Sequence, residues 1–280
     1  MTDSHAKSPT QATGESTRPL DDGEIHVYQD GPREAPALLL IHGTAMSARS
    51  WDPMVPLLTG SHRVIRIDLL GCGRSAKPDG ASYAVPDQAR RAGAVLDRLG
   101  VEHAIAVGHS SGGTVATALA ERRPDLVTAL ALINTGPTMA AYLGEGAAID
   151  PKQSPNFTDE QLRQAISSAF APGYQIPPSF LDQVRDMDFP VFAATSQAIR
   201  AYLDERSLPV RLAPLGKPLL VLFGERDRRW RPSSAADYRA VPGATVTMLP
   251  GVGHSPNLEA PPRTAAPLLA FTANHAPQSD

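Results

Sequence analysis

The 280-residue sequence has a single cysteine, Cys72, and no long apolar run. One cysteine cannot form an intramolecular disulfide, so nothing in the sequence indicates an oxidising compartment. No stretch approaches the roughly 18 consecutive apolar residues that a membrane-spanning helix needs. Residues 1–18 are polar, lack the apolar core of a secretory signal, and are predicted to form a disordered tail. We therefore expect a soluble, cytoplasmic protein.

Metal-binding and nucleotide-binding motifs are also missing. No group of histidine, cysteine and acidic residues has the spacing of metal ligands, and no G-x-G-x-x-G or P-loop opens a helix. We therefore expect no cofactor and no metal.

The net charge of −3 gives no electrostatic reason to expect nucleic acid or an anionic membrane as a partner. The expected partner is a small-molecule substrate, bound by a monomer or homodimer. Lysine is scarce among the basic residues, which suggests a bacterial source.

Short apolar runs alternate with helical segments through most of the chain. Continuous apolar runs of about 4–8 residues are typical of strands buried on both faces of a parallel sheet. Their alternation with helices predicts a doubly wound α/β sheet, which a strand pair around residues 23–29 is expected to begin in antiparallel fashion. The expected later strands are residues 37–41, 63–67, 104–107, 127–133, 218–223 and 244–249, and the expected helices are residues 86–99, 114–122, 233–240 and 263–273.

Residues 137–215 interrupt this alternation because they contain no convincing strand. Helices are predicted to begin there at Thr158 and Ser179, which lie three residues before Gln161 and Asp182 as N-cap residues do. Prolines separate these helical pieces. We interpret the segment as a helical lid inserted into a single core formed by residues 19–136 and 216–275.

The sequence Gly108-His109-Ser110-Ser111-Gly112 matches G-x-S-x-G, the nucleophile elbow. It lies between a predicted strand and a predicted helix, which is the context that this motif requires. A sharp turn would project the oxygen of Ser110 above the sheet, and a Cβ at Gly108 or Gly112 would collide with neighbouring elements. A nucleophilic role for Ser110 is predicted over the alternative of a tight structural turn.

A nucleophilic serine needs a base and an orienting carboxylate, and both follow Ser110 in the order serine, aspartate, histidine. Asp227 follows the strand expected at residues 218–223, and His254 follows the last expected strand. His254 is predicted to move the proton and Asp227 to orient the imidazole. Glu225 is the alternative acid. Asn134, at the other position where such a sheet can hold its acid, carries no charge and therefore favours Asp227.

Two backbone N–H groups are expected to form an oxyanion hole. One belongs to Ser111, the residue after the nucleophile. The other is assigned to Thr44, in the loop after the strand at residues 37–41, with Ala45 as the alternative. His42 in the same loop is interpreted as a support for that loop and as a possible contact of the substrate.

With these residues in place, the chain resembles the α/β-hydrolase superfamily over roughly residues 23–273. Residues 66–75 look like its D-x-x-G-x-G-x-S loop, and Trp51 and Pro232 fit its pattern. The resemblance implies the α/β-hydrolase fold, a mostly parallel, doubly wound, eight-stranded sheet with a helical lid inserted after the sixth strand. Dehalogenases and epoxide hydrolases of similar outline use an aspartate nucleophile, so Ser110 argues against both activities.

The resemblance implies a serine hydrolase that cleaves an ester or lactone of a small, largely apolar organic molecule through an acyl-enzyme. The alternatives are a carbon–carbon bond hydrolase with the same triad, a non-hydrolytic isomerase or cyclase, and a ligand-binding protein.

The arginines at 226, 228, 229 and 231 are predicted to be a solvated loop edge, with a rim for carboxylate substrates as the alternative. The residues expected to line the substrate site are His42, His109, Met139, Tyr142, Phe170, Tyr174, Phe180, Met187, Phe192 and Trp230.

Overall fold

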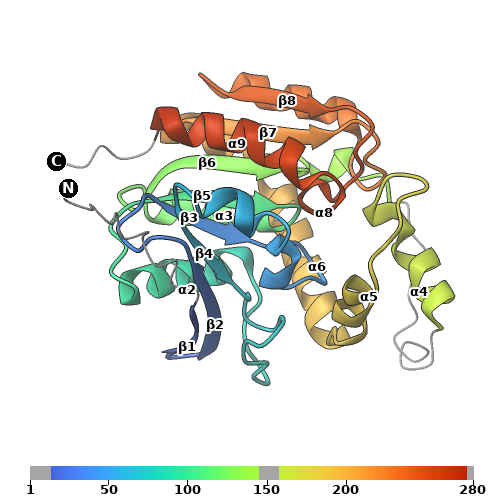
Figure 1. The fold of residues 1–280 in the computed structure, drawn as a ribbon, viewed down its shortest axis with the longest axis horizontal. Helices are drawn as coiled ribbons and strands as arrows, with labels where there is room; N and C mark the ends of the chain where they lie inside the picture. The colour runs from blue at the N-terminus through green and yellow to red at the C-terminus, as the bar shows by residue number, and fades with distance from the viewer. Residues whose placement is uncertain (1–13, 145–157, 276–280) are drawn as a thin grey trace, which may run out of the picture.

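The structure, a computed structural model, describes residues 14–144 and 158–275. Within these residues, eight strands form one sheet in the order β1-β2-β4-β3-β5-β6-β7-β8 (Figure 1). The pairs β1–β2 and β2–β4 are antiparallel, and the five other pairs are parallel. The predicted doubly wound sheet and each of its expected strands are therefore confirmed. The strands are β1 (Gly14–Leu20), β2 (Gly23–Asp30), β3 (Ala37–Ile41), β4 (Arg63–Ile67), β5 (Ala104–His109), β6 (Val127–Ile133), β7 (Leu219–Gly224) and β8 (Thr245–Leu249).

The central strands are apolar along their whole length because both faces of the sheet are covered. All residues of β3 and β5 are buried. Successive side chains of β3 point to opposite faces, so Leu38 and Leu40 join one core cluster while Leu39 and Ile41 join the other. The first cluster includes Trp51 and residues of α1 and α9, and the second includes residues of α2, α3 and α7.

Helices expected from the sequence are present on both faces, with one change of type. Residues 233–240 are expected to be α-helical and instead form the 3₁₀ helix η6. The Oγ of Ser234 donates to the carbonyl of Arg231 over 2.7 Å, as does its N–H over 3.0 Å, which favours the tighter i→i+3 pattern. The core elements are η1 (Ala48–Trp51), α1 (Val55–Leu58), α2 (Val85–Arg98), α3 (Gly112–Arg122), η6 (Pro232–Ala240), α8 (Pro256–Glu259) and α9 (Pro261–His275).

The expected disordered tail is wrong for residues 14–18, which belong to β1. This edge strand pairs with β2 along its whole length, from Gly14 opposite Gln29 to Leu20 opposite Gly23. The strand is held mainly by main-chain pairing with β2 and not by burial of its side chains. Its polar sequence therefore gives no apolar pattern from which a strand could be predicted. The hairpin turn is tied to α2 because Asp22 accepts hydrogen bonds from Arg91. Residues 1–13 of the expected tail lie outside the described residues.

The described part of residues 137–215 contains helices and no strand. Figure 1 shows α4, α5 and α6 gathered beyond the end of the sheet to which the parallel strands point. Apolar side chains of α4 and α5 form a small core of their own with Met46 and Phe170. None of the described helices is long and apolar enough to cross a membrane. The elements are η2 (Met139–Ala141), α4 (Asp159–Ile166), η4 (Ser167–Ala169), α5 (Pro178–Arg185), α6 (Phe189–Glu205), α7 (Leu208–Leu212) and η5 (Ala213–Leu215).

One of the two expected N-caps in this segment is confirmed. Thr158 caps α4 in a capping box, with its Oγ1 accepting from the N–H of Gln161 over 3.3 Å. Ser179 is not an N-cap, because α5 already begins at Pro178. A proline suits the first helical position, where its fixed φ is helical and its missing N–H has no partner to lose.

Candidate active site

Ser110 lies in a strained turn between β5 and α3. Its φ of +52° is in the left-handed region, which residues other than glycine rarely occupy. The turn is held by hydrogen bonds from the Ser110 N–H to the carbonyl of Ile133 (2.8 Å) and from the N–H of Gly113 to the Ser110 carbonyl (3.0 Å). A Cβ on Gly108 would overlap the backbone of Gly112, and one on Gly112 would overlap the carbonyl of Ile41. The glycines of the motif therefore permit a close approach of three backbone segments.

The structure brings Ser110, His254 and Asp227 into one line of hydrogen bonds. The Nε2 atom of His254 lies 3.0 Å from Ser110 Oγ, and its Nδ1 atom lies 2.9 Å from Asp227 Oδ2. The Asp227 carboxylate accepts a hydrogen bond from Nδ1–H, which leaves the lone pair of Nε2 directed at the serine hydroxyl. His254 can therefore take the hydroxyl proton as Ser110 attacks an electrophile.

Asp227 is buried and has four hydrogen-bond donors. Oδ1 accepts from the N–H groups of Arg229 (2.7 Å) and Trp230 (3.1 Å), while Oδ2 accepts from His254 and from Asn134 Nδ2 (2.7 Å). Burial alone would raise the pKa of this carboxyl, but the charge of His254 and these hydrogen bonds outweigh it and lower the pKa. The group is therefore a carboxylate at neutral pH.

Asn134 has a part in this arrangement that the sequence did not predict. Its φ is +47°, and its side chain bridges three segments. Besides Asp227, its Nδ2 donates to the carbonyl of Gly253 (3.1 Å), and its Oδ1 accepts from the N–H of Gly224 (3.1 Å). The alternative acid, Glu225, has an exposed side chain, and Asp227 is the residue that contacts the histidine.

The loop after β3 lies against the nucleophile. A Cβ on Gly43 would be 3.1 Å from the Cβ of Ser110. The Oγ1 atom of Thr44 donates to Ser111 Oγ over 2.8 Å and so joins the loop to the elbow. Among the described residues, no backbone carbonyl accepts from the N–H of Thr44, Ala45 or Ser111. These donors are therefore available to an oxygen at the site, as an oxyanion hole requires.

His42 does not line the cavity around Ser110, so the expectation that it contacts the substrate is wrong. The main chain occupies both of its ring nitrogens. Nε2 accepts from the N–H of Leu69 (3.0 Å), which leaves Nδ1–H to donate to the carbonyl of Gly43 (2.8 Å). Burial lowers the pKa of His42, which keeps the ring neutral. The ring supports the Gly43–Thr44 loop.

His109 is buried beneath His254 and lines the cavity. Its Nε2–H donates to the main-chain carbonyl of His254 over 2.8 Å, and the two ring centroids are 5.2 Å apart. Burial lowers the pKa of His109 to about 3, and the charge of His254 acts in the same direction. The neutral His109 ring therefore holds the main chain of His254 in place through this hydrogen bond.

The D-x-x-G-x-G-x-S loop is joined to the segment that follows the Gly43–Thr44 loop. Asp68 accepts hydrogen bonds from the N–H groups of Ala48 (2.7 Å) and Arg74 (2.9 Å). Its own carbonyl accepts from Ser75 Oγ over 2.6 Å. The carboxylate lies so close to Gly73 that a Cβ there would overlap it. Asp68 therefore ties the motif to the start of η1, and Leu69 ties it to His42, which supports the Gly43–Thr44 loop.

A cavity of about 370 Å³ opens above Ser110 and His254. Apolar side chains from α4, α5 and α6 form much of its wall. Tyr142, Phe180, Met187 and Phe192 line it, as expected from the sequence. Its remaining wall is formed by Gly43, Thr44, Ala45, Met46, His109, Gly144, Ala165, Ile166, Ser168, Ala169, Val184, Arg229 and Ser255.

Four apolar residues expected in this wall are absent from it, namely Met139, Phe170, Tyr174 and Trp230. Phe170 is 1% exposed and is enclosed by Tyr174, on which it stacks at 5.1 Å, and by Phe180. Trp230 covers the backbone of Gly136, and Met139 packs against the main core. These four side chains pack in the hydrophobic clusters instead, whereas Phe180 on α5, Met187 after α5 and Phe192 on α6 reach the cavity.

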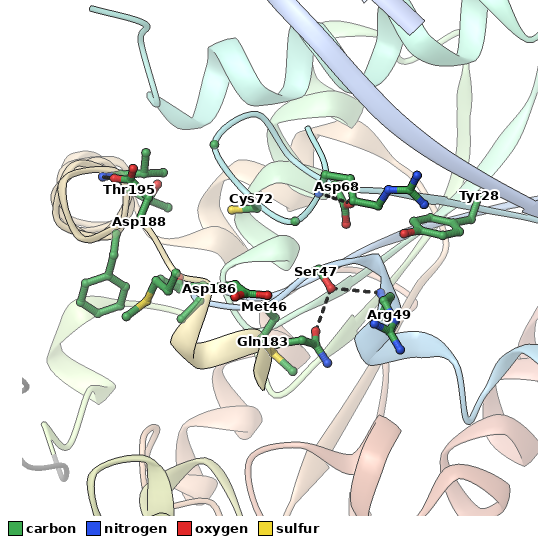
Figure 2. Close-up of a pocket in the computed structure, with 18 residues that line it drawn as sticks. Tyr28, Met46, Ser47, Arg49, Asp68, Cys72, Gln183, Asp186, Asp188 and Thr195 are labelled. Carbon is green, nitrogen blue, oxygen red and sulfur yellow. Dashed lines mark hydrogen bonds between the residues drawn. The ribbon is translucent and has the colours of Figure 1, made fainter. Parts of the chain in front are cut away.

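A second cavity of about 170 Å³ adjoins the first (Figure 2). It lies between the D-x-x-G loop and the α5–α6 connection. Ser47 Oγ donates to Gln183 Oε1 over 2.7 Å and so links the core to α5 across it. The two cavities share the wall residues Thr44, Ala45, Met46, Met187 and Phe192.

The arginines near Asp227 differ in their surroundings. Arg226 and Arg231 are exposed, in keeping with the predicted solvated loop edge. Arg229 is partly buried and belongs to the wall of the larger cavity, so that interpretation is wrong for this residue. Among the described residues, no group of three or more His, Cys, Asp or Glu side chains could hold a metal ion.

Comparisons with known proteins agree with this architecture. Residues 38–266 match the sequence profile of the alpha/beta hydrolase family. The chain is 28% identical over 264 residues to haloalkane dehalogenase 2 of Mycobacterium tuberculosis, with 88% of this chain and 91% of that protein covered. It is 24% identical over 255 residues to an uncharacterised carboxylesterase of Bacillus subtilis, with 85% and 80% covered. A solved structure of a hydrolase from Pseudomonas aeruginosa has a TM-score of 0.77 at 27% identity, over 92% of this chain and 97% of that one.

Proposed function

This chain belongs to the alpha/beta hydrolase family, and from this membership we propose that it is a serine hydrolase. The proposed reaction is cleavage of an ester or lactone of a small, largely apolar organic molecule through an acyl-enzyme. The observation that carries the proposal is the line of hydrogen bonds from Ser110 through His254 to Asp227. Each member has the chemistry that its role as nucleophile, base or orienting carboxylate needs.

Acylation begins when Ser110 Oγ attacks the carbonyl carbon and His254 Nε2 takes the hydroxyl proton. The new bond turns the carbonyl oxygen into an oxyanion, which the N–H groups of Ser111 and Thr44 stabilise by about 3 kcal/mol each. Collapse of the tetrahedral intermediate breaks the bond to the leaving alkoxide, which receives the proton from His254. A water molecule then repeats these steps on the acyl-enzyme and releases the acid.

Asp227 acts in this scheme by fixing the tautomer and the orientation of His254. Its low pKa keeps it ionised while the imidazole gains a proton, so the carboxylate stabilises the imidazolium. The donors from Asn134 and from the main chain of residues 229 and 230 hold both oxygens in position.

The helices of residues 137–215 are proposed to be a lid that shapes the substrate site. Phe180, Val184, Met187 and Phe192 contribute an apolar wall to the cavity that contains Ser110. Such a wall supports a substrate with a largely apolar body. The adjoining cavity in Figure 2 offers room for the part of a longer substrate that lies beyond Met46.

The likeness to a dehalogenase does not extend the proposal to dehalogenation. Dehalogenases of this outline use an aspartate nucleophile, whereas this chain has Ser110 at the elbow. A serine ether formed by displacement of a halide has no carbonyl for water to attack. The carboxylesterase relative is consistent with the proposed ester chemistry.

Turnover of a panel of p-nitrophenyl esters and lactones tests the proposal, with Ser110→Ala as the variant and Ser111→Ala as its matched neighbour. We expect Ser110→Ala to lower kcat by about 10⁴- to 10⁶-fold. Ser111→Ala keeps the backbone N–H and loses one side-chain hydrogen bond, so kcat should fall by no more than about tenfold. Equal activity of wild type and Ser110→Ala would refute the assignment. Absence of turnover with every ester and lactone would favour a non-hydrolytic role.

We also propose that the enzyme works in the cytoplasm as a monomer or homodimer on a free small-molecule substrate. The net charge of −3 supports the absence of nucleic acid and anionic membrane as partners. Light scattering on the purified chain distinguishes a mass of 29.7 kDa from twice that value.

A further inference from the structure

Arg229 is a cation in the wall of the cavity that contains Ser110. Its Nε atom has one weak hydrogen bond, to Ser168 Oγ at 3.3 Å. Neither Nη atom has a hydrogen-bond partner among the described residues, and neither is sealed from solvent. The guanidinium therefore has donors free for a group inside the cavity.

The Arg229 charge has no carboxylate partner among the described residues. Within the described parts of the chain, no Asp or Glu oxygen lies within 4.0 Å of the Arg229 guanidinium. Asp227 is the nearest candidate by sequence, but its oxygens already accept from His254, Asn134 and two main-chain N–H groups. Burial lowers the pKa of Arg229, because its surroundings disfavour the charged form.

Three other buried arginines of this protein pair with a carboxylate. Arg66 pairs with Asp30 and Arg211 with Glu121, at 2.7 and 3.2 Å. Arg91 pairs with Asp22. Arg63 lacks a carboxylate, yet its Nη2 donates to Gln29 Oε1 and to the carbonyl of Leu99. Arg229 differs from the first three in having no carboxylate partner among the described residues, and from Arg63 in lying in the wall of the cavity that contains Ser110.

A cation surrounded largely by apolar wall is costly unless an anion joins it. Ile166, Val184 and Met187 contribute apolar surface to the same cavity. A planar guanidinium with two free Nη atoms matches the two oxygens of a carboxylate. We propose that Arg229 binds a carboxylate group of the substrate, so that the preferred substrates are esters or lactones that carry a second, ionised carboxyl.

This inference rests on the proposed function, since it assigns the substrate class of the same site. Ester hydrolysis is measured with p-nitrophenyl hemisuccinate, hemiglutarate and hemiadipate, each paired with a neutral ester of equal chain length. The variant Arg229→Gln keeps a polar side chain without the charge. Arg226→Gln, on the exposed side of the same loop, is the matched control. Arg229→Lys keeps the positive charge but lacks the planar guanidinium that can donate two parallel hydrogen bonds to a carboxylate.

We expect Arg229→Gln to raise KM for the best anionic ester about 10- to 100-fold more than for its neutral partner. Arg229→Lys should recover part of the preference, and Arg226→Gln should retain the wild-type ratio. Added salt should raise the wild-type KM for the anionic ester. Equal changes for anionic and neutral esters would mean a structural role and would overturn the proposal. If Arg226→Gln raised KM for the anionic ester as much as Arg229→Gln, the proposal would also be overturned. The general positive charge of the loop would then explain the preference for anionic esters.

Binding without turnover separates failure of this inference from failure of the proposed function. Glutarate is titrated calorimetrically into Ser110→Ala and into the double variant Ser110→Ala/Arg229→Gln. Binding that the second substitution weakens about tenfold or more supports the carboxylate site even if no ester is hydrolysed. Equal binding by the two variants, or binding by neither, refutes the site and leaves the serine chemistry to be judged on its own assay.

Discussion

Asn134 donates a hydrogen bond from Nδ2 to Oδ2 of Asp227 over 2.7 Å, and the same carboxylate oxygen accepts from His254. The asparagine is fully buried, and it also holds the N–H of Gly224 and the carbonyl of Gly253. The side-chain amide of Asn134 thus joins the end of β7, which precedes Asp227, to the loop after β8, which carries His254. Asparagine supplies here both a donor and an acceptor, which an aspartate at this position could not do when ionised.

Asn134→Ala should therefore impair catalysis without removing any reacting group. The loss of a hydrogen bond to a charged group costs about 1.5–3 kcal/mol, so kcat should fall about 10- to 100-fold. The pKa of Asp227 should rise because one of the bonds that lower it is gone. The measurement is kcat with a neutral ester. Asn274→Ala, an exposed asparagine of α9, is the control. Wild-type kcat in Asn134→Ala would contradict the bracing role.

His109 should make the protein less stable in mild acid. Burial lowers its pKa from the ordinary 6.5 to about 3 in the folded state. Between these values the unfolded chain binds a proton that the folded chain does not. The free energy of unfolding should therefore fall as pH drops below 6.5, by up to about 1.4 kcal/mol per pH unit from this group.

Urea denaturation between pH 4 and pH 7 tests this titration when wild type is compared with His109→Gln. The glutamine has no titrating group and keeps an N–H donor for the carbonyl of His254. Its unfolding free energy should be lower than that of the wild type at pH 7 and should vary less with pH. Parallel curves for the two proteins would show that His109 is not the titrating group.

Gly112→Ala should destabilise the fold strongly, because the added Cβ would overlap the carbonyl oxygens of Ile41 and His42. Both are backbone atoms and cannot rotate away, so we expect a loss of at least about 2 kcal/mol. Gly60→Ala is the matched control, since a Cβ there meets no atom within 4 Å. Thermal unfolding compares the two variants. A similar Tm for both would contradict the close approach of β3 and α3.

The sheet and the hydrogen-bonded line of Ser110, His254 and Asp227 could be predicted from patterns in the sequence. Continuous apolar runs such as residues 127–133 predict strands covered on both faces, and G-x-S-x-G predicts the turn at Ser110. The order of Asp227 and His254 after successive strands followed from the same reasoning. β1 escaped prediction because an edge strand held by main-chain pairing needs no apolar pattern.

The wall of the cavity was harder to predict because it depends on which face of each helix turns inward. Phe170 and Trp230 are large and apolar, and both are used in packing. Four arginines lie close together in the sequence around Asp227, and only the folded loop distinguishes Arg229 from the others by placing it in the cavity wall. The sequence shows that Asn134 is uncharged, but its hydrogen bonds depend on the fold, which places β7 and the loop after β8 beside it.

Covalent labelling by a fluorophosphonate, measured by intact mass, shows directly whether Ser110 is an activated nucleophile. A phosphonylating reagent reacts with a serine that a neighbouring base activates and leaves ordinary hydroxyl groups unmodified. We expect one adduct per wild-type chain, mapped to Ser110, and none in Ser110→Ala. No adduct on the wild type, or an undiminished adduct in Ser110→Ala, would contradict this role of Ser110.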